Sequence, residues 1–175
     1  MKHILTEPYT KEKIAAFRTG DTVLITGTIY AARDAAHKRL EEMIENGQML
    51  PLDLQNAILY YAGPTPARPG YPIGSAGPTT SGRMDPYTPL LLEQGVLATI
   101  GKGPRNKEVI EAIKKQEAVY LAAIGGAAAV IAQCVETAEV VAFEELGTEA
   151  IRKLTVRELP VVVAIDRSGK SIYEK

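Results

Sequence analysis

The residue types best suited to chemistry gather in one stretch of the chain, residues 77–86. Three neighbouring hydroxyls, a guanidinium and a carboxylate stand there between glycines and prolines: Thr79, Thr80, Ser81, Arg83 and Asp85. Glycine permits unusual backbone angles and proline fixes φ, so this composition is typical of a shaped loop. If a helix begins near Pro86, the hydroxyls and free N–H groups face its positive end, and Arg83 adds a bidentate donor. That arrangement suits a carboxylate or a phosphate, and a polar capping turn is the alternative.

Two further cations stand at expected junctions between a strand and a helix. Arg33 follows a β-branched run at 22–26 and enters a helix that Asn46-Gly47 ends. Lys102 lies in a Gly-Lys-Gly turn after an apolar run at 96–100. Side chains at such junctions commonly meet ligands in α/β proteins. The alternatives are a solvated arginine at a helix start and an ordinary turn, because Gly-Lys-Gly lacks the glycine spacing of a phosphate loop.

The elements that must position these residues are predicted from hydrophobic periodicity and from turn residues. Strands are expected at 1–8, 22–26, 57–62, 96–100, 118–124 (ended by Gly125-Gly126), 140–143, 160–165 and 171–173. Helices are expected at 11–18, 31–46, 86–93, 106–116 and 127–135, with irregular helix at 144–158. This alternation predicts one α/β domain over residues 1–175, and it equally suggests a doubly wound sheet.

The composition is that of an ordinary soluble globular protein, with 46% hydrophobic and 23% charged residues. Lys and Arg total 20 while Asp and Glu total 21, so the charge favours neither nucleic acid nor a membrane surface as a partner. No apolar run approaches the roughly 20 residues of a membrane span, and the first residues lack the pattern of a signal peptide.

Cys134 is the single cysteine, which excludes an internal disulfide framework and indicates a reducing, cytoplasmic setting. One cysteine and two histidines cannot ligate an iron–sulfur cluster or a closed zinc site within one chain, so any such metal must come from a partner. Cys134 itself is expected to pack as a small hydrophobe. It lies in the 127–135 stretch, which is small and apolar all round and therefore predicts a helix that is buried or packed on another subunit.

Five motifs together resemble a known family. They are Thr26-Gly27, the run 32–37 (Ala-Arg-Asp-Ala-Ala-His), the run 60–64 (Tyr-Tyr-Ala-Gly-Pro), the nine residues 77–85, and the run 100–103 (Ile-Gly-Lys-Gly). Over essentially the whole chain the sequence looks like the β subunit, or C-terminal catalytic domain, of class I iron–sulfur fumarases and L-tartrate dehydratases. The resemblance implies a hydro-lyase that hydrates fumarate to malate or dehydrates tartrate. It also implies a three-layer, swivelling β/β/α domain.

In that family a separate α subunit or N-terminal domain holds a [4Fe-4S] cluster, whose open iron acts as a Lewis acid on the substrate. This chain is then expected to bind no metal itself. The resemblance assigns proton transfer to Thr79 with Arg83 as its activator, and substrate contacts to Arg33, Thr80 and Lys102. Asp85 is expected to be a helix cap or the partner of an arginine, and His37 to be structural.

Alternatives stay open at this point. Fumarate and tartrate are not separated by the motif residues. A non-catalytic anion-binding module of the same fold is the rival class, although it would not need to keep Arg33, Thr79, Arg83 and Lys102 together. The resemblance also implies a small dicarboxylate as ligand and an assembly such as α2β2 with the cluster-bearing subunit.

Overall fold

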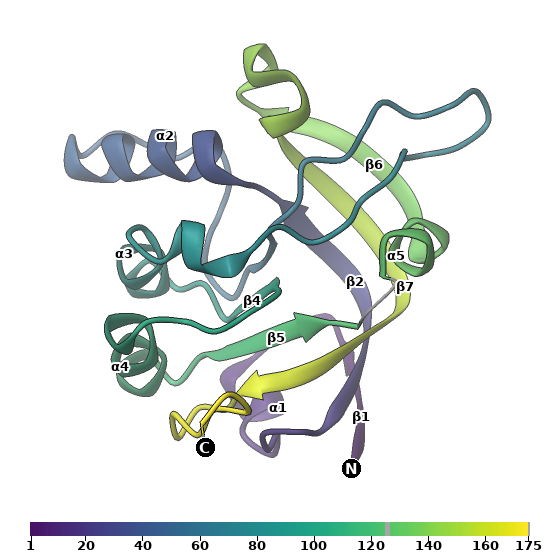
Figure 1. Cartoon of the computed structure of the whole chain (residues 1–175). Helices are drawn as coiled ribbons and strands as arrows, with labels where there is room; N and C mark the ends of the chain where they lie inside the picture. The colour runs from purple at the N-terminus through teal and green to yellow at the C-terminus, as the bar shows by residue number, and fades with distance from the viewer. Residues whose placement is uncertain (125–126, 175) are drawn as a thin grey trace.

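The computed structural model describes residues 1–124 and 127–174 and has the expected α/β class, with helices and strands of one sheet (Figure 1). The expected end of a strand at Gly125-Gly126 lies outside the described residues. Within them the sheet contains β1 (Lys2–Thr6), β2 (Thr22–Ala31), β3 (Ile58–Tyr60), β4 (Ala98–Gly101), β5 (Val119–Ala123), β6 (Val135–Ala142) and β7 (Ile151–Ile165).

Five of these strands close on themselves into a barrel. Parallel pairing joins β2 to β3, β3 to β4 and β4 to β5, and antiparallel pairing joins β5 to β7 and β7 back to β2. The remaining described strands extend the ring, since β1 pairs with the first half of β2 and β6 with the first half of β7. These pairings therefore describe a barrel closed by two long strands, β2 and β7, and not a doubly wound sheet.

Strand β2 is twice the expected length because it continues through Gly27. The residues after Thr26 were expected to leave the strand, and Ala31 was expected to begin a helix. The pairing of β2 with β7 instead shifts register between Ile25 and Gly27, as at a β-bulge. Gly27 has φ +142°, and a Cβ there would overlap the Tyr9 hydroxyl and the Glu7 side chain. Only glycine permits this bend, which lets one strand serve both ends of the barrel.

The largest difference from the predicted elements concerns strand β7. Residues 144–158 were expected to be irregular helix, but only the 3₁₀ helix η2 (Glu144–Glu149) is helical, and β7 starts at Ile151. Pro160, which cannot donate to a ladder, sits inside the strand beside the bend of β2. There Glu158 has φ +51°, and its N–H bonds to Thr26 Oγ1 at 2.9 Å in place of a strand partner.

Smaller differences concern the ends of elements. The expected strand at 171–173 reduces to a single bridge between Ile165 and Ser171. The first helix, α1 (Lys11–Ile14), is shorter than expected and is capped by Thr10. Strand β6 begins directly after the helix at 127–134, earlier than expected.

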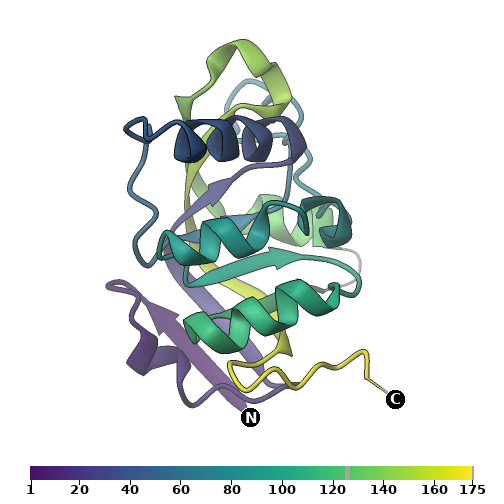
Figure 2. The same ribbon diagram turned by 90° about the vertical axis from the view of Figure 1, so that its left-hand side faces the viewer.

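Three helices cover one side of the barrel: α2 (Asp34–Glu45), α3 (Thr88–Glu93) and α4 (Lys107–Gln116) (Figure 2). Alternate residues of the strands divide between two apolar layers. Ile58 and Tyr60 face the barrel interior, whereas Leu59 between them packs toward the helices with residues such as Leu40 and Val109. The period-2 alternation is the pattern of a strand buried on both faces. Each strand end is therefore rigidly fixed.

Helix α5 (Ala127–Cys134) lies on the other side of the barrel (Figure 1). Its Ile131 is buried against the barrel, and the half-buried Cys134 packs there as the expected small hydrophobe. Ala129 and Val130 are exposed, so the described part of this helix is not buried all round. Of the two predicted settings, complete burial within the chain is wrong.

Candidate functional site

The site is built on the ends of three parallel strands. Because β2, β3 and β4 are parallel neighbours, their carboxyl ends lie at one end of the barrel. The residues that follow them are Arg33 after β2, Tyr61 to Gly63 after β3, and Lys102 after β4. Ligands of α/β proteins bind at such carboxyl ends. The structure thus gathers the two junction cations that the sequence singled out.

The motif loop crosses this end of the barrel and is bound to two of the strands. The Thr79 N–H donates to the Tyr61 carbonyl at 2.7 Å, and the Ser81 N–H donates to the Lys102 carbonyl at 2.8 Å. Thr80 forms a parallel bridge with Lys102. Thr79 is half-buried and Thr80 is exposed. Backbone contacts therefore hold Thr79, the predicted proton-transfer residue, at Tyr61 and place Thr80, the predicted substrate contact, beside Lys102.

The loop ends in the 3₁₀ helix η1 (Ser81–Met84), which carries Arg83. The following helix, α3, starts at Thr88 and not at Pro86, so the predicted helix start is two residues early. Its positive end is consequently not adjacent to the threonines in sequence, and the motif is shaped chiefly by its ladder to Lys102 and Tyr61.

Arg33 and Arg83 meet at one carboxylate. Arg83 Nε donates to Asp34 Oδ2 at 2.9 Å, and Arg33 Nε lies 3.5 Å from Asp34 Oδ1. Asp34 contacts both guanidinium groups on their Nε side. Within residues 1–124 and 127–174, the Nη atoms of these two arginines have no hydrogen-bond partner. Their bidentate edges are therefore available for an anion.

A second carboxylate borders this pair. Glu149 from η2 accepts from the Ala35 N–H at 3.1 Å at the start of α2, and it lies 3.8 Å from Arg33 Nε. The Arg33 stem packs on Gly63, where a Cβ would lie 2.7 Å from Arg33 Cδ. Arg33 is thus fixed by contacts along its stem and at Nε.

The sequence comparison decides the family. The pattern of the family described as Fumarase C-terminus matches residues 2–175 of this chain. The chain belongs to this family. The family membership expected from the five motifs is thereby confirmed.

Relatives of two kinds resemble this Fumarase C-terminus chain. Fumarate hydratase 2 of Leishmania major is 40% identical over 94% of the chain and 29% of its own length. The anaerobic class I fumarate hydratase of Escherichia coli is 40% identical over 100% of the chain and 31% of its own length. A candidate L(+)-tartrate dehydratase subunit beta of Methanocaldococcus jannaschii is 39% identical over 95% of the chain and 88% of its own length. The chain therefore spans under a third of the two fumarate hydratases.

Two further predictions for this Fumarase C-terminus chain concern Asp85 and His37. Asp85 is the partner of an arginine, as one of its two predicted roles required, and that arginine is the buried Arg105. His37 is fully buried on α2, and its Nδ1 lies 2.8 Å from the Arg33 carbonyl. Burial lowers the pKa of His37 to about 4, so the ring is neutral at pH 7 and donates to that carbonyl. The structural role expected for His37 is supported by this geometry.

Arg105 is the main residue that the sequence reading missed. It follows Gly-Lys-Gly-Pro, where nothing in the local pattern distinguishes it from a solvated turn residue. Its partners lie up to 44 residues away along the chain, so a local pattern could not reveal them. Three residues before it in sequence stands Lys102, which gave the only hint of its location.

The described residues offer no donor set for a metal centre: they contain no group of three or more His, Cys, Asp or Glu side chains that could hold an ion. Cys134 lies on α5 with its Sγ 3.8 Å from the Glu158 carbonyl, and burial raises the pKa of its thiol. A lone protonated thiol is a poor ligand for an iron–sulfur cluster. Among the same residues no helix is long and apolar enough to cross a membrane.

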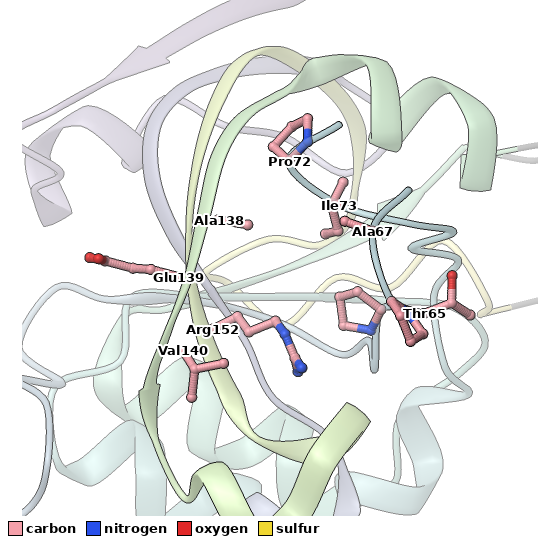
Figure 3. Close-up of a pocket in the computed structure, with 10 residues that line it drawn as sticks. Thr65, Ala67, Pro72, Ile73, Ala138, Glu139, Val140 and Arg152 are labelled. Carbon is pink, nitrogen blue, oxygen red and sulfur yellow. The ribbon is translucent and has the colours of Figure 1, made fainter. Parts of the chain in front are cut away.

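Two cavities flank the loop that precedes the motif. One of about 140 Å³ lies between that loop and strands β6 and β7, where Thr65 and Ile73 face Ala138 and Arg152 (Figure 3). Another of about 680 Å³ lies between the loop and α5. Neither of these two cavities is lined by any of the five predicted site residues.

Proposed function

We propose that this chain is the β subunit of an iron–sulfur hydro-lyase that reversibly hydrates fumarate to malate with a cluster-bearing α subunit. The observation that carries the proposal is the arginine pair at Asp34, with the Nη edges of Arg33 and Arg83 left for a ligand. A dicarboxylate needs cations in fork geometry, which guanidinium groups supply. The curated relatives named fumarate hydratase support the same reaction class.

Three tasks fall to this chain's own residues. Arg33 and Arg83 bind a substrate carboxylate, and the ammonium of Lys102 adds a point charge beside the motif loop. Thr79 moves the proton at the substrate carbon, because the neighbouring positive charge of Arg83 lowers the cost of a threonine alkoxide. Thr80, exposed and bridged to Lys102, contacts the substrate.

The expected [4Fe-4S] cluster does not fit the donors of this chain. With Cys134 alone on α5, and no cluster of acidic or histidine side chains among the described residues, the ligands must come from the partner. The proposal therefore places the cluster on the α subunit and assigns no metal-bound step to these residues. A cytoplasmic setting and an α2β2 assembly belong to the same proposal, supported by the absence of cysteine pairs and by the exposed face of α5.

L-tartrate dehydration is the second candidate function. One observation favours it: the candidate tartrate dehydratase subunit beta matches over 88% of its own length, so it is a free-standing chain of similar extent. The same arginine pair would bind tartrate, which is also a dicarboxylate. The three-layer, swivelling β/β/α domain fold implied by the family resemblance is likewise part of the proposal.

Reconstitution tests the proposal. The purified chain should be colourless and inactive alone, and anaerobic mixing with a cluster-loaded α subunit should give fumarate hydration followed by absorbance. L-tartrate in a parallel assay distinguishes the second candidate. Light scattering of the mixture should show at least one copy of each subunit. Strong hydratase activity from this chain alone, without iron, would refute the assignment.

A further inference from the structure

A buried ion pair lies directly beneath the site. Arg105 has a side chain that is 0% exposed, and its Nε donates to Asp85 Oδ1 at 2.6 Å. The other oxygen of Asp85 accepts from the Asn106 N–H at 2.9 Å. Both partners are thus shielded from water and cannot themselves touch a substrate at the surface.

The guanidinium of Arg105 uses its remaining nitrogens to join separate elements. Nη1 donates to Thr99 of β4 at 3.2 Å, and Nη2 donates to Thr88 of α3 at 2.7 Å and to the Tyr61 hydroxyl at 3.1 Å. The ring of Tyr120 on β5 lies 4.8 Å from its central carbon. One side chain therefore fixes the mutual placement of four segments.

Three of the residues or strands that Arg105 contacts connect directly to a site residue. Tyr61 accepts the Thr79 N–H through its carbonyl, Asp85 closes η1 two residues after Arg83, and Lys102 directly follows β4. A second link runs parallel to this one. The Ser81 hydroxyl lies 2.6 Å from the Tyr120 hydroxyl, which donates to the Gly103 carbonyl at 2.7 Å.

The approach of the motif to β4 is so close that it demands glycine. A Cβ at Gly101 would overlap the Ser81 hydroxyl and lie 2.7 Å from the Tyr61 ring. The loop therefore has little room to shift against Lys102, provided that its far end is also held. Asp85 is that far end, and Arg105 is what holds it.

We propose that Arg105 and Asp85 are positioning residues that set where the motif loop presents Thr79 and Arg83 relative to Lys102. This inference rests on the proposed function for the meaning of that placement. Buried ion pairs are weak contributors to stability, since desolvation offsets their attraction, and apolar replacements are often tolerated. A network in which every nitrogen of the guanidinium has a hydrogen-bond partner is better suited to specifying one arrangement of loops.

The test uses a double variant, Arg105→Met with Asp85→Asn, which removes both charges and keeps similar volume. In the isolated chain, amide hydrogen exchange reports the loop directly through the Thr79 and Ser81 N–H groups. We expect their exchange to accelerate by about tenfold or more, while amides in the β2–β7 ladder keep their rates. The single variant Arg105→Lys retains the charge, so exchange at these amides should accelerate less than in the double variant. This single variant is measured instead if the double variant does not fold.

A matched control lies at the opposite end of the barrel. Asp166 is also buried and accepts from Thr19 and Ser168, so Asp166→Asn removes a comparable buried charge far from the motif loop. It should leave exchange at Thr79 and Ser81 unchanged relative to the ladder. Unchanged exchange at these amides in the double variant, or equal acceleration throughout the barrel, would overturn the positioning role.

Kinetics of the reconstituted enzyme separate this inference from the function on which it rests. Misplacement of Thr79 should lower kcat by about tenfold to a hundredfold with a smaller change in KM, and Arg105→Lys should recover part of kcat. A double variant with local acceleration but parent kcat would also overturn the proposal. If the parent complex itself shows no activity, local acceleration still supports the positioning of the loop, and the proposed function is what fails.

Discussion

The charged side chains at the two ends of the barrel differ in how fully their hydrogen-bonding atoms are paired. At the end where β2 begins and both termini lie (Figure 1), carboxylates are saturated with donors. Asp21 accepts from the Met1 amino group, from His3 and from the Arg18 N–H. Asp166 accepts from the backbone and hydroxyls of Thr19 and Ser168. These contacts tie the chain ends to the barrel.

At the carboxyl ends of β2, β3 and β4, cations instead retain unused donors. The guanidinium groups of Arg33 and Arg83 are held on one side only, and Lys102 is exposed. Two guanidinium forks and an ammonium group at one end of the barrel suit a carboxylate ligand. The difference separates an end that closes the fold from an end that binds an anion, and each prediction below tests that separation.

The largest effect is expected at Thr79. Thr79→Val is nearly isosteric and keeps the N–H bond to Tyr61, but it removes the hydroxyl. If Thr79 moves the proton, kcat of the reconstituted enzyme should fall by about 10²–10⁴ with little change in KM. Thr79→Ser should retain part of the rate. Thr137→Val, on the exposed side of β6, is the matched control and should behave as the parent.

Cluster content must be equal in all of these complexes before rates are compared. A Thr79→Val enzyme that runs near the parent rate would show that the proton is handled by the partner. The cation-rich end of the barrel would then bind the substrate without taking part in proton transfer. It would differ from the opposite end in substrate affinity alone.

A smaller effect is expected when the fork of Arg33 is removed and its charge kept. Arg33→Lys should raise KM for the dicarboxylate about ten- to a hundredfold, as expected for a lost charge-assisted hydrogen bond of about 1.5–3 kcal/mol. Arg39→Lys is a matched control, because Arg39 lies on the helix that follows Arg33 and pairs with an η2 carboxylate, Glu145 at 2.7 Å. Equal KM values for the two variants would remove Arg33 from the clamp.

Asp34→Asn asks whether the shared carboxylate holds the arginines or competes with the substrate. The Asp34 pairs are partly exposed and contribute about 0–1 kcal/mol, so KM should rise by no more than about fivefold. Whether KM rises or falls distinguishes the two roles of Asp34. A fall in KM would mean that Asp34 competes with the substrate for the two arginines, so that the substrate does not bind at the Nη edges alone.

Features of the fold that depend on residues close together in sequence could be predicted, and features that depend on contacts between distant residues could not. The placement of Arg33 and Lys102 after a strand was predicted, because each run is bounded locally by glycine and polar residues, although the strand before Arg33 ends at Ala31 and not at Thr26. The lengths of β2 and β7 were not. Gly27 and Pro160 are ordinary stop signals, and only their pairing across the barrel turns them into a bend within two continuous strands.

The same distinction between local and distant contacts applies to the residues of the site. The five predicted residues do lie at one end of the barrel, because a contiguous motif and two strand ends suffice to locate them. The support beneath them could not be predicted, since Arg105 gathers Tyr61, Asp85, Thr88 and Thr99 from separate elements. Side chains that bind are often read from short motifs, whereas those that position are fixed by tertiary contacts.

The smallest effect is expected at the other end, where it should be confined to the free energy of unfolding and to its dependence on pH. The hydrogen bond from His3, then that from the Arg18 N–H, lowers the pKa of Asp21 to about 2 from its ordinary value of 3.8. A carboxyl whose pKa is lower in the folded state stabilises the fold above the unfolded value and loses that contribution as pH falls through the folded value. The Asp21 contribution is therefore complete above about pH 4 and gone near pH 2.

Asp21→Asn should lower the free energy of unfolding at neutral pH and converge with the parent as the pH approaches about 2. Denaturant unfolding of both proteins across that range measures the convergence. Glu136→Gln, which alters an exposed carboxyl on β6, should run parallel to the parent throughout. The kinetic constants of the reconstituted Asp21→Asn enzyme should match those of the parent at neutral pH, because the saturated end carries no ligand contact. A change in KM of the Asp21→Asn enzyme would show that the two ends are coupled. The separation between an end that closes the fold and an end that binds an anion would then be wrong.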